Sequence, residues 1–233
     1  MSNKLCVVIP YRDRESQIPL FVEGFDKFIS KRHDNLDYKV VLVNQCDAHE
    51  FNRASLLNVG FLENREEYDY FAFHDLDMIP QLRESEDDDH ADYSKPDSIR
   101  RLFSPTKYSM GGTILMTREA IEQTYGWPNV YWGWGGEDRN MFHRVCHFNV
   151  PIDEPDIYFR DKKFAKRRYN ELDCCHDPKR KSFKGTQKKI TSYYSENKHL
   201  YAEDNLDKCL YEVRSVDGVA LKVHMYNTYL EKN

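Results

Sequence analysis

The chain has 233 residues, of which 40% are hydrophobic and 14% aromatic, and its formal net charge is −5. This length and aromatic content suffice for a buried core, which excludes an intrinsically disordered protein and predicts a single domain over 1–233. The acidic balance excludes general nucleic-acid binding, because such binding needs a basic domain. No apolar run reaches about 18 residues, so we expect no transmembrane segment in this chain.

The six cysteines form no CxxC pair and no regular framework, which argues against a disulfide-stapled or zinc-binding protein. Cys6 and Cys46 lie inside or beside apolar runs, where reduced thiols packed in a core are expected. We therefore expect a reduced, intracellular protein.

Apolar runs and amphipathic segments alternate over the first eighty residues. Runs rich in β-branched and aromatic residues predict buried strands at 5–10, 39–44 and 70–74. Apolar residues at three- and four-residue spacings predict helices at 16–31 and 51–62. Strand–helix alternation implies right-handed crossovers, and hence an α/β fold with a mostly parallel central sheet flanked by helices.

Polar side chains follow each of the three predicted strands. In parallel sheets the ligand binds beyond the carboxyl ends of the strands, so these residues are the first candidates for a site. They are Arg12, Arg14, Asn44, Gln45, Asp75 and Asp77.

Asp75 and Asp77 form a DxD tripeptide directly after the third strand. Alternation along an extended chain turns both carboxylates to the same side. Two converging carboxylates suit a hard divalent cation that carries a diphosphate. A plain turn at the strand end is the other interpretation of the same residues.

Two charge runs stand out. The stretch 84–92 has six acids in nine residues, which is typical of a solvated loop. The stretch 160–189 has twelve Lys or Arg against four acids, which predicts either a region that attracts a phosphate-bearing ligand or an ordinary lysine-rich surface.

The stretch YWGWGGED at 131–138 puts two tryptophans beside three glycines and two acids. Glycines let the backbone approach a ligand closely, and indoles offer flat faces to sugar rings. A following acid is placed to accept a proton from a bound hydroxyl. A tryptophan-rich corner with a carboxylate at a helix N-terminus is the structural alternative, because 137–145 reads as a helix.

Five motifs, in this order along the chain, resemble the β-1,4-galactosyltransferase family, whose members are inverting GT-A glycosyltransferases that use UDP-sugars and Mn²⁺. The motifs are PYRDR at 10–14, FNRA through NVGF at 51–61, HDLDMIP at 74–80, the glycine pair at 111–112 and YWGWGGED at 131–138. The resemblance implies a single GT-A-like domain, with a nucleotide-binding half at 1–80 and an acceptor and catalytic half at 81–233.

The resemblance also implies roles for individual residues. Trp134 would lie between donor and acceptor sugars, Glu137 would hold hydroxyls of the donor sugar, and Asp138 would be the catalytic base. Asp75 would hold the ribose. The other residues implied to bind nucleotide or donor are Pro10, Arg12, Arg14, Phe51, Arg53, Ser109, Gly111 and Gly112.

For the metal, Asp77 is the first implied ligand of Mn²⁺. The stretch CCHDP at 174–178 looks like the HxHDP stretch of the xylose-directed branch of the family, with cysteine at the first histidine. His176 is then the second ligand, and Cys174 is a third candidate although a thiolate is soft for Mn²⁺. Because 160–189 contains His176, the resemblance also predicts that this basic stretch closes over bound donor and metal.

Two departures from the family concern the sugars. Arg139 follows the base where the family usually has a second acid that helps to bind the acceptor, so acceptor identity does not transfer. Ser109 stands where a bulky tyrosine often crowds the donor sugar, and Tyr108 precedes it. The donor is therefore UDP-galactose or UDP-N-acetylgalactosamine.

The sequence thus predicts a metal-dependent inverting glycosyltransferase that acts on a saccharide or glycoconjugate acceptor. The alternatives are the same fold with UDP-N-acetylgalactosamine or UDP-glucose, and an inactive sugar- or nucleotide-binding protein. A metal nuclease is disfavoured, because no further cluster of acids or histidines accompanies the DxD. The expected location is the cytoplasm if the chain is complete, and the Golgi lumen if an N-terminal anchor has been removed.

Overall fold

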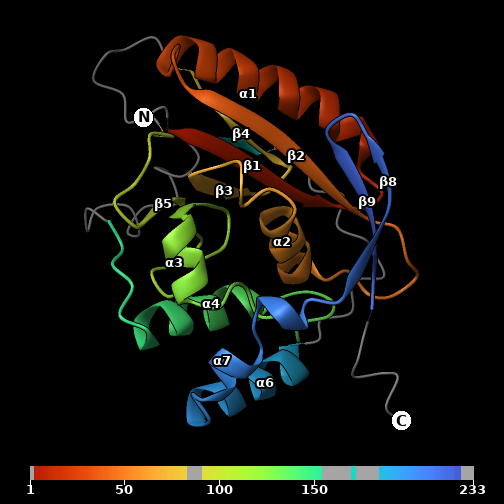
Figure 1. The fold of residues 1–233 in the computed structure, drawn as a ribbon, viewed down its shortest axis with the longest axis vertical. Coiled ribbons are helices and arrows are strands. Elements are labelled where there is room, and N and C mark those ends of the chain that lie inside the picture. The colour runs from red at the N-terminus through yellow and green to blue at the C-terminus, as the bar shows by residue number, and fades with distance from the viewer. Residues whose placement is uncertain (1–2, 83–90, 154–168, 172–183, 227–233) are drawn as a thin grey trace.

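A computed structural model describes residues 3–82, 91–153, 169–171 and 184–226. Its core is a seven-stranded sheet in the order β5-β6-β3-β1-β2-β9-β8 (Figure 1). The four central strands are mutually parallel, and the outer strands pair antiparallel. The strands are β1 (Lys4–Tyr11), β2 (Asp37–Gln45), β3 (Tyr70–His74), β5 (Ile99–Phe103), β6 (Thr113–Thr117), β8 (Tyr211–Asp217) and β9 (Ala220–Met225).

Helices cover both faces of this sheet (Figure 1). A second, two-stranded ladder pairs β4 (Met78–Pro80) with β7 (Tyr169–Glu171). The helices are η1 (Glu15–Gln17), α1 (Ile18–Arg32), α2 (Arg53–Leu62), α3 (Arg118–Gln123), α4 (Glu137–His147), α6 (Lys184–Glu196), α7 (Leu200–Glu203) and η2 (Leu206–Lys208).

The alternation of side chains along β1 divides the core into two layers. Leu5, Val7 and Ile9 face α1, and Cys6 and Val8 face α2. Because both faces are covered, the strand reads as a continuous apolar run, which is why its sequence shows no polar alternation. The predicted strands and helices of the first eighty residues are all present, and the expected α/β fold with a central sheet flanked by helices is confirmed.

Two features of the fold differ from the sequence prediction: the strand directions in the sheet and the first residue of helix α2. The sheet is mixed, because β6 runs antiparallel to β3 and the consecutive pairs β5–β6 and β8–β9 place an antiparallel strand at each edge. The helix expected from residue 51 begins at Arg53, because Asn52 is its N-cap and accepts a hydrogen bond from the Ser55 N–H at 3.0 Å.

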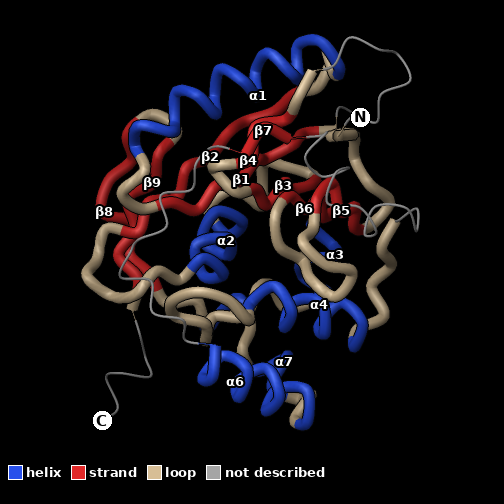
Figure 2. Tube along the Cα trace, turned by 180° about the vertical axis from the view of Figure 1, so that it is seen from behind, coloured by secondary structure: helices blue, strands red, loops and turns tan. Residues whose placement is uncertain are grey.

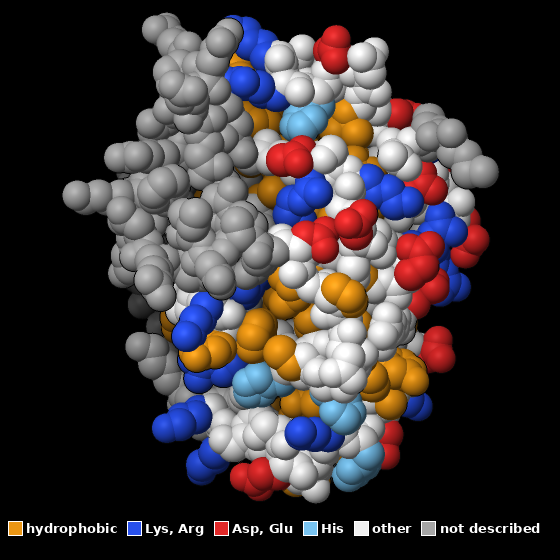
Figure 3. Space-filling view, turned by 90° about the vertical axis from the view of Figure 1, so that its left-hand side faces the viewer, with side chains coloured by type: hydrophobic (Ala, Val, Ile, Leu, Met, Phe, Trp, Pro, Cys, Tyr) orange, Lys and Arg blue, Asp and Glu red, His pale blue; other side chains and the backbone are white. Residues whose placement is uncertain are grey.

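Helices α4, α6 and α7 form a further layer beyond α2 (Figure 2). On the face seen in Figure 3, acidic and basic side chains alternate over the upper part, and hydrophobic and histidine side chains gather below. Among the described helices, none has the length and apolarity needed to cross a membrane.

The thiols of Cys6, Cys46, Cys146 and Cys209 are free. Cys6 and Cys209 are buried, and burial raises the pKa of both thiols. Cys46 is exposed, so the expectation of a core thiol holds for Cys6 alone of the two strand cysteines.

Candidate active site

The predicted polar residues gather where β1, β2 and β3 end. β3 finishes at the buried His74, whose Nδ1–H donates to the Asp75 carbonyl at 2.9 Å. Burial lowers the pKa of His74 to about 4, so the ring is neutral and its Nε2 accepts from the Tyr93 hydroxyl at 2.9 Å. These two bonds hold the backbone at the start of the DxD tripeptide.

Arg53 joins the two regions that the sequence singled out. Its Nε and Nη2 donate to Asp75 Oδ1 at 2.9 and 2.7 Å, and its Nη1 lies 3.3 Å from Asp138 Oδ1. The guanidinium also lies 5.6 Å from the Trp127 ring centroid. Arg53 begins α2, so the N-cap at Asn52 sets the direction in which this cation points.

The other two predicted arginines lie on the β1 side of the site. Arg14 Nη1 contacts Asp77 Oδ2 at 3.3 Å. Arg12 donates to the His49 carbonyl at 2.6 Å and lies over the Phe51 ring, 5.6 Å from its centroid. The two arginines and Phe51 therefore form one cationic and aromatic wall beside the DxD.

Gln45, at the end of β2, shapes the loop that carries this wall. Its side-chain amide donates to the Glu50 carbonyl at 3.0 Å, and its Oε1 accepts from the Asn52 N–H at 2.9 Å. The sequence made Gln45 a candidate ligand-binding residue at the end of β2. In the structure its side chain instead bonds to the backbone of the loop before α2.

Asp77 is a desolvated carboxylate with one described cation beside it. Burial raises its pKa, the charge of Asp75 raises it further, and Arg14 opposes both effects. A carboxylate in that position is stabilised by any further positive charge that arrives. Oxygen donors of this kind suit Mg²⁺, Ca²⁺ and Mn²⁺, so Asp77 and Asp75 fit the oxygen-rich end of a divalent metal site.

The acids of the WGWGGED stretch open helix α4. Gly135 and Gly136 have φ of 93° and 100°, a conformation that other residues rarely adopt, and they turn the chain into Glu137 and Asp138. Glu137 is buried, and its Oε2 has no hydrogen-bond partner in the described part of the chain. Burial, followed by the charge of Asp138, raises the pKa of Glu137 to about 8.

Asp138 is bordered by Arg53, Met110 and Gly111. Burial raises the pKa of its carboxyl, and the charge of Arg53 lowers it. Its carbonyl accepts from the Met110 N–H at 3.1 Å. A Cβ on Gly111 would lie 2.3 Å from Asp138 Oδ2, so only glycine fits there. The first glycine of the predicted pair thus makes room for the carboxylate.

The residues around that glycine pair are also placed. Gly112 has φ of 82°. Ser109 is buried, and its hydroxyl accepts from the Gly111 N–H at 3.2 Å. Tyr108 is 54% exposed and packs edge-on against Phe142, so it does not take the place of Ser109.

The two tryptophans of the stretch differ in burial. Trp134 is 48% exposed. Trp132 is half-buried and meets the His49 ring edge-on, with 5.6 Å between centroids. The backbone between them is tied to the nucleotide wall, because the Gly133 N–H donates to the Phe51 carbonyl at 2.9 Å.

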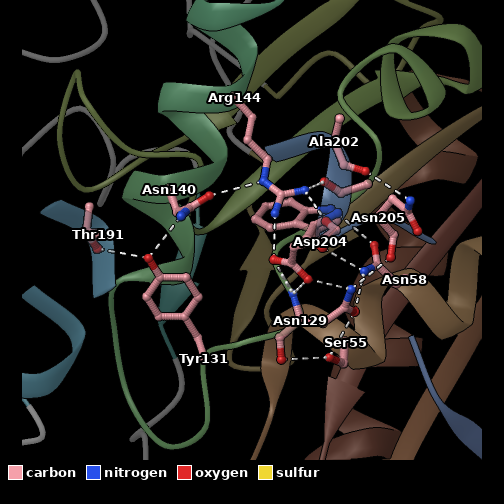
Figure 4. Close-up of polar contacts among 12 residues, drawn as sticks. Ser55, Asn58, Asn129, Tyr131, Asn140, Arg144, Thr191, Ala202, Asp204 and Asn205 are labelled. Atoms are coloured by element: carbon pink, nitrogen blue, oxygen red, sulfur yellow. Dashed lines mark hydrogen bonds and ion pairs between the residues drawn. The ribbon is translucent and has the colours of Figure 1, made fainter. Parts of the chain in front are cut away.

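A buried ion pair supports α4 from behind (Figure 4). Arg144 is fully buried, and its Nη2 donates to Asp204 Oδ2 at 2.7 Å. Its Nη1 donates to the Asp204 carbonyl at 2.8 Å and its Nε to Asn140 Oδ1 at 3.1 Å. Asn140 in turn donates to the Tyr131 hydroxyl at 3.0 Å.

The same network reaches α2. Asp204 accepts from the Asn129 backbone and side chain at 3.0 to 3.2 Å, and Asn129 Oδ1 accepts from Asn58 at 3.0 Å and from Ser55 at 3.2 Å. Helices α2 and α4, which carry Arg53 and Asp138, are therefore fixed to one polar framework.

Sequence reasoning did not identify this framework. A signal was present, because Arg144 lies on the same helical face as Met141 and Val145. A cation at a core position needs a buried partner. The partner, Asp204, lies 60 residues away and cannot be found by spacing.

His176 and Cys174 lie outside the described residues, as does most of the basic stretch 160–189. Its described strand β7 pairs with β4, opposing Met78 with Glu171 and Pro80 with Tyr169. The described part of the basic stretch at β7 is therefore paired with the strand that directly follows Asp77.

Two sequence families match the chain. The N-terminal region of glycosyl transferase group 7 matches residues 1–93, and the N-terminal domain of galactosyltransferase matches residues 100–172. Mouse β-1,4-galactosyltransferase 1 is 33% identical over 180 residues, covering 69% of this chain. The chain belongs to the β-1,4-galactosyltransferase family.

Other members of the galactosyltransferase family cover more of the chain. Mouse β-1,4-galactosyltransferase 7 is 28% identical over 94% of it. This chain spans 64% of the length of that relative and 43% of the length of mouse β-1,4-galactosyltransferase 1. The catalytic domain of Drosophila β-1,4-galactosyltransferase 7, solved with xylobiose, superposes with a TM-score of 0.79 and 27% identity over 98% of this chain and 97% of that one.

Proposed function

We propose that this chain transfers galactose from UDP-galactose to a hydroxyl of a saccharide acceptor, with inversion at the anomeric carbon and with Mn²⁺. The observation that carries the proposal is the pair of adjacent carboxyls that opens α4, with one of them held by Arg53. In support, a Drosophila β-1,4-galactosyltransferase 7 mutant, 25% identical with a TM-score of 0.75, is solved with manganese, UDP-Gal and xylobiose.

Asp138 acts as general base in this proposal. It takes the proton from the acceptor hydroxyl while that oxygen bonds to the anomeric carbon, and the bond to UDP breaks on the opposite face. No enzyme nucleophile is needed, because displacement is a single step. Arg53 favours the ionised form that the base requires, since it lowers the pKa that burial raises.

Glu137 is the neutral partner. With its pKa at about 8 it carries a proton at neutral pH, and in the described part of the chain its Oε2 is unpaired. A buried carboxyl with an open hydrogen-bonding position is suited to hold a donor-sugar hydroxyl. Trp134 supplies an exposed ring at which the two sugars meet.

Pro10, Arg12, Arg14 and Phe51 are assigned to the nucleotide, in the proposed donor half 1–80. The cationic wall beside Phe51 suits uracil and phosphate oxygens together. Asp77 would hold Mn²⁺, with His176 and Cys174 as further ligands, and Asp75 would hold the ribose. When bound, the metal supplies positive charge to the departing diphosphate.

UDP-N-acetylgalactosamine is the second candidate donor. Ser109 presents a small side chain beside Gly111, and Tyr108 packs away against Phe142. A serine at this position avoids the crowding by which a bulky side chain would exclude an N-acetyl group.

A donor panel tests the proposal. Hydrolysis of UDP-galactose, UDP-N-acetylgalactosamine and UDP-glucose is measured with Mn²⁺, followed by transfer to xylobiose. We expect galactose or N-acetylgalactosamine to be used, and metal removal to abolish turnover. No turnover on any donor, with UDP still bound, would contradict the transferase proposal and favour an inactive binding protein.

Asp138→Asn tests the base. The amide cannot accept the proton, so kcat falls by about 10²–10⁴-fold while UDP affinity is retained. Transfer at the wild-type rate would show that another group is the base.

A further inference from the structure

A pocket of about 600 Å³ lies outside the site described above. It is bounded by α7, by the end of β9 and by the segment around Asn129 and Trp132. Neither the arginines nor the carboxylates of the proposed active site line it. Its volume falls within the range of about 300–1,000 Å³ that is typical of small-molecule sites.

Three aromatic side chains line this pocket: Trp132, Tyr194 and Tyr226. Trp132 is fixed, because its carbonyl accepts from Gln187 at 3.3 Å and its ring meets His49. Tyr194 is buried, with its ring 5.9 Å from that of Tyr201. Rigid aromatic faces of this kind stack on the C–H faces of sugar rings.

The pocket also offers hydrogen-bonding groups that have no partner among the described residues. Glu203 and Lys208 are exposed at its rim, and neither side chain bonds to another described residue. The Trp132 indole N–H is likewise unused among the described residues. Asp204 and Asn129, by contrast, are taken up by the framework around Arg144 (Figure 4).

We propose that this pocket binds a pyranose unit of a saccharide. Aromatic faces with a carboxylate, an ammonium and an indole N–H around them match a ring that is apolar on its faces and hydroxylated on its edge. One acid and one base at the rim favour a neutral sugar. A nucleotide is disfavoured, because a diphosphate needs several cations and Lys208 is the single cation among the described residues that line the pocket.

The pocket and the proposed active site share helix α2 and the stretch 131–138. Ser55 lines the pocket, and Arg53, two residues earlier on α2, contacts Asp75 and Asp138. Trp132 also borders the loop that leads to Asp138. The assignment of this sugar unit to the acceptor chain rests on the proposed transferase function. The binding of a free saccharide in the pocket is independent of that function.

Binding is measured by calorimetry with three neutral tetrasaccharides: xylotetraose, cellotetraose and chitotetraose. At least one is expected to bind the wild type and to bind the double variant Glu203→Gln/Lys208→Met about tenfold or more weakly, because two charge-assisted hydrogen bonds are lost. The matched control, Glu196→Gln/Lys198→Met, alters an exposed acid and base outside the pocket and keeps wild-type affinity. Unchanged melting temperatures show that both variants fold.

No binding of any tetrasaccharide, or equal binding by wild type and the Glu203/Lys208 variant, overturns the proposal. Acceptor kinetics then separate the two sources of the sugar. If the pocket holds the acceptor chain, the KM for the tetrasaccharide is below that for its disaccharide, and the variant raises only the former. If it holds a separate glycan, affinity falls in the variant and neither KM changes. Variant-sensitive binding without transfer to any acceptor would refute the proposed function and leave the pocket standing.

Discussion

Two clusters in this protein are built from the same residue types and differ in how fully they are paired. Around Arg144, one arginine satisfies one buried aspartate, and amides take up the remaining groups. Around Arg53, one arginine is shared between Asp75 and Asp138, and Glu137 beside them keeps an oxygen with no partner among the described residues. In the saturated cluster around Arg144, every charged group has a partner, and the cluster holds helices in place. In the undersupplied cluster around Arg53, the carboxyls have too few cations and hydrogen-bond donors within the described part of the chain, so they can bind the charge and hydrogen bonds that a substrate brings.

The largest effect is expected from breaking the saturated cluster. Arg144→Met leaves Asp204 buried without its cation and lowers the free energy of unfolding by about 3–5 kcal/mol. Urea denaturation measures it. Arg214→Met is the matched control, because its pair with Glu212 is about half exposed and contributes about 1 kcal/mol or less. Equal losses in the two variants would show that the Arg144 pair is not special.

Gly111→Ala perturbs the cluster around Arg53 by adding one methyl group beside Asp138, without changing any charge. The new Cβ would lie 2.3 Å from Asp138 Oδ2, so the carboxylate must move, and a displacement near 1 Å costs about 10²-fold in rate. Steady-state kinetics of transfer measure the loss of kcat. Gly218→Ala, in the β8–β9 turn, serves as control: at φ of 57° an alanine strains the backbone, but no atom lies within 4 Å of the new Cβ, so the variant keeps kcat even if its stability falls. Full activity of the Gly111 variant would contradict the proposed position of the base.

Arg53→Met tests whether the charge of Arg53 controls the pKa of Asp138. Arg53 lowers the pKa of Asp138, so its removal raises that pKa and reduces the ionised fraction at any given pH. The acid limb of the kcat profile should move up by about 1–3 pH units, the range expected for the loss of a neighbouring opposite charge. Arg14→Met, which removes a cation from Asp77 and not from Asp138, should leave that limb in place. A common shift in both variants would refute a specific role for Arg53.

Glu137→Gln tests the pH dependence of stability instead of the stability at a single pH. The folded pKa, about 8, lies above the unfolded value near 4.5, so the folded state binds more protons between these values. Stability is therefore fully present below about pH 4.5 and is lost as pH rises towards 8. The glutamine variant should lose this dependence and be more stable than wild type at pH 8. Thermal denaturation across pH 4–9, with Glu196→Gln as an exposed control, measures it; parallel curves would contradict the raised pKa.

The elements around the donor side of the site could be predicted from sequence because they depend on local patterns. β3 was expected at 70–74 and lies there, since a short apolar run rich in aromatic residues is typical of a strand buried on both faces. Asp75 and Asp77 follow from that strand's end. The glycines of the 131–138 stretch likewise predicted an unusual backbone, and Gly133, Gly135 and Gly136 all have positive φ.

Only the tertiary structure decided which distant groups meet. Nothing in local spacing links Arg53 to Asp138, which lie 85 residues apart, or Arg144 to Asp204. β9 joins the sheet beside β2 although its sequence, ALKVHM, gave no recognised signal, because strand pairing depends on the partner's edge as well as on the strand's own residues. Local periodicity specifies elements, while long-range charge pairing and strand order depend on how those elements pack.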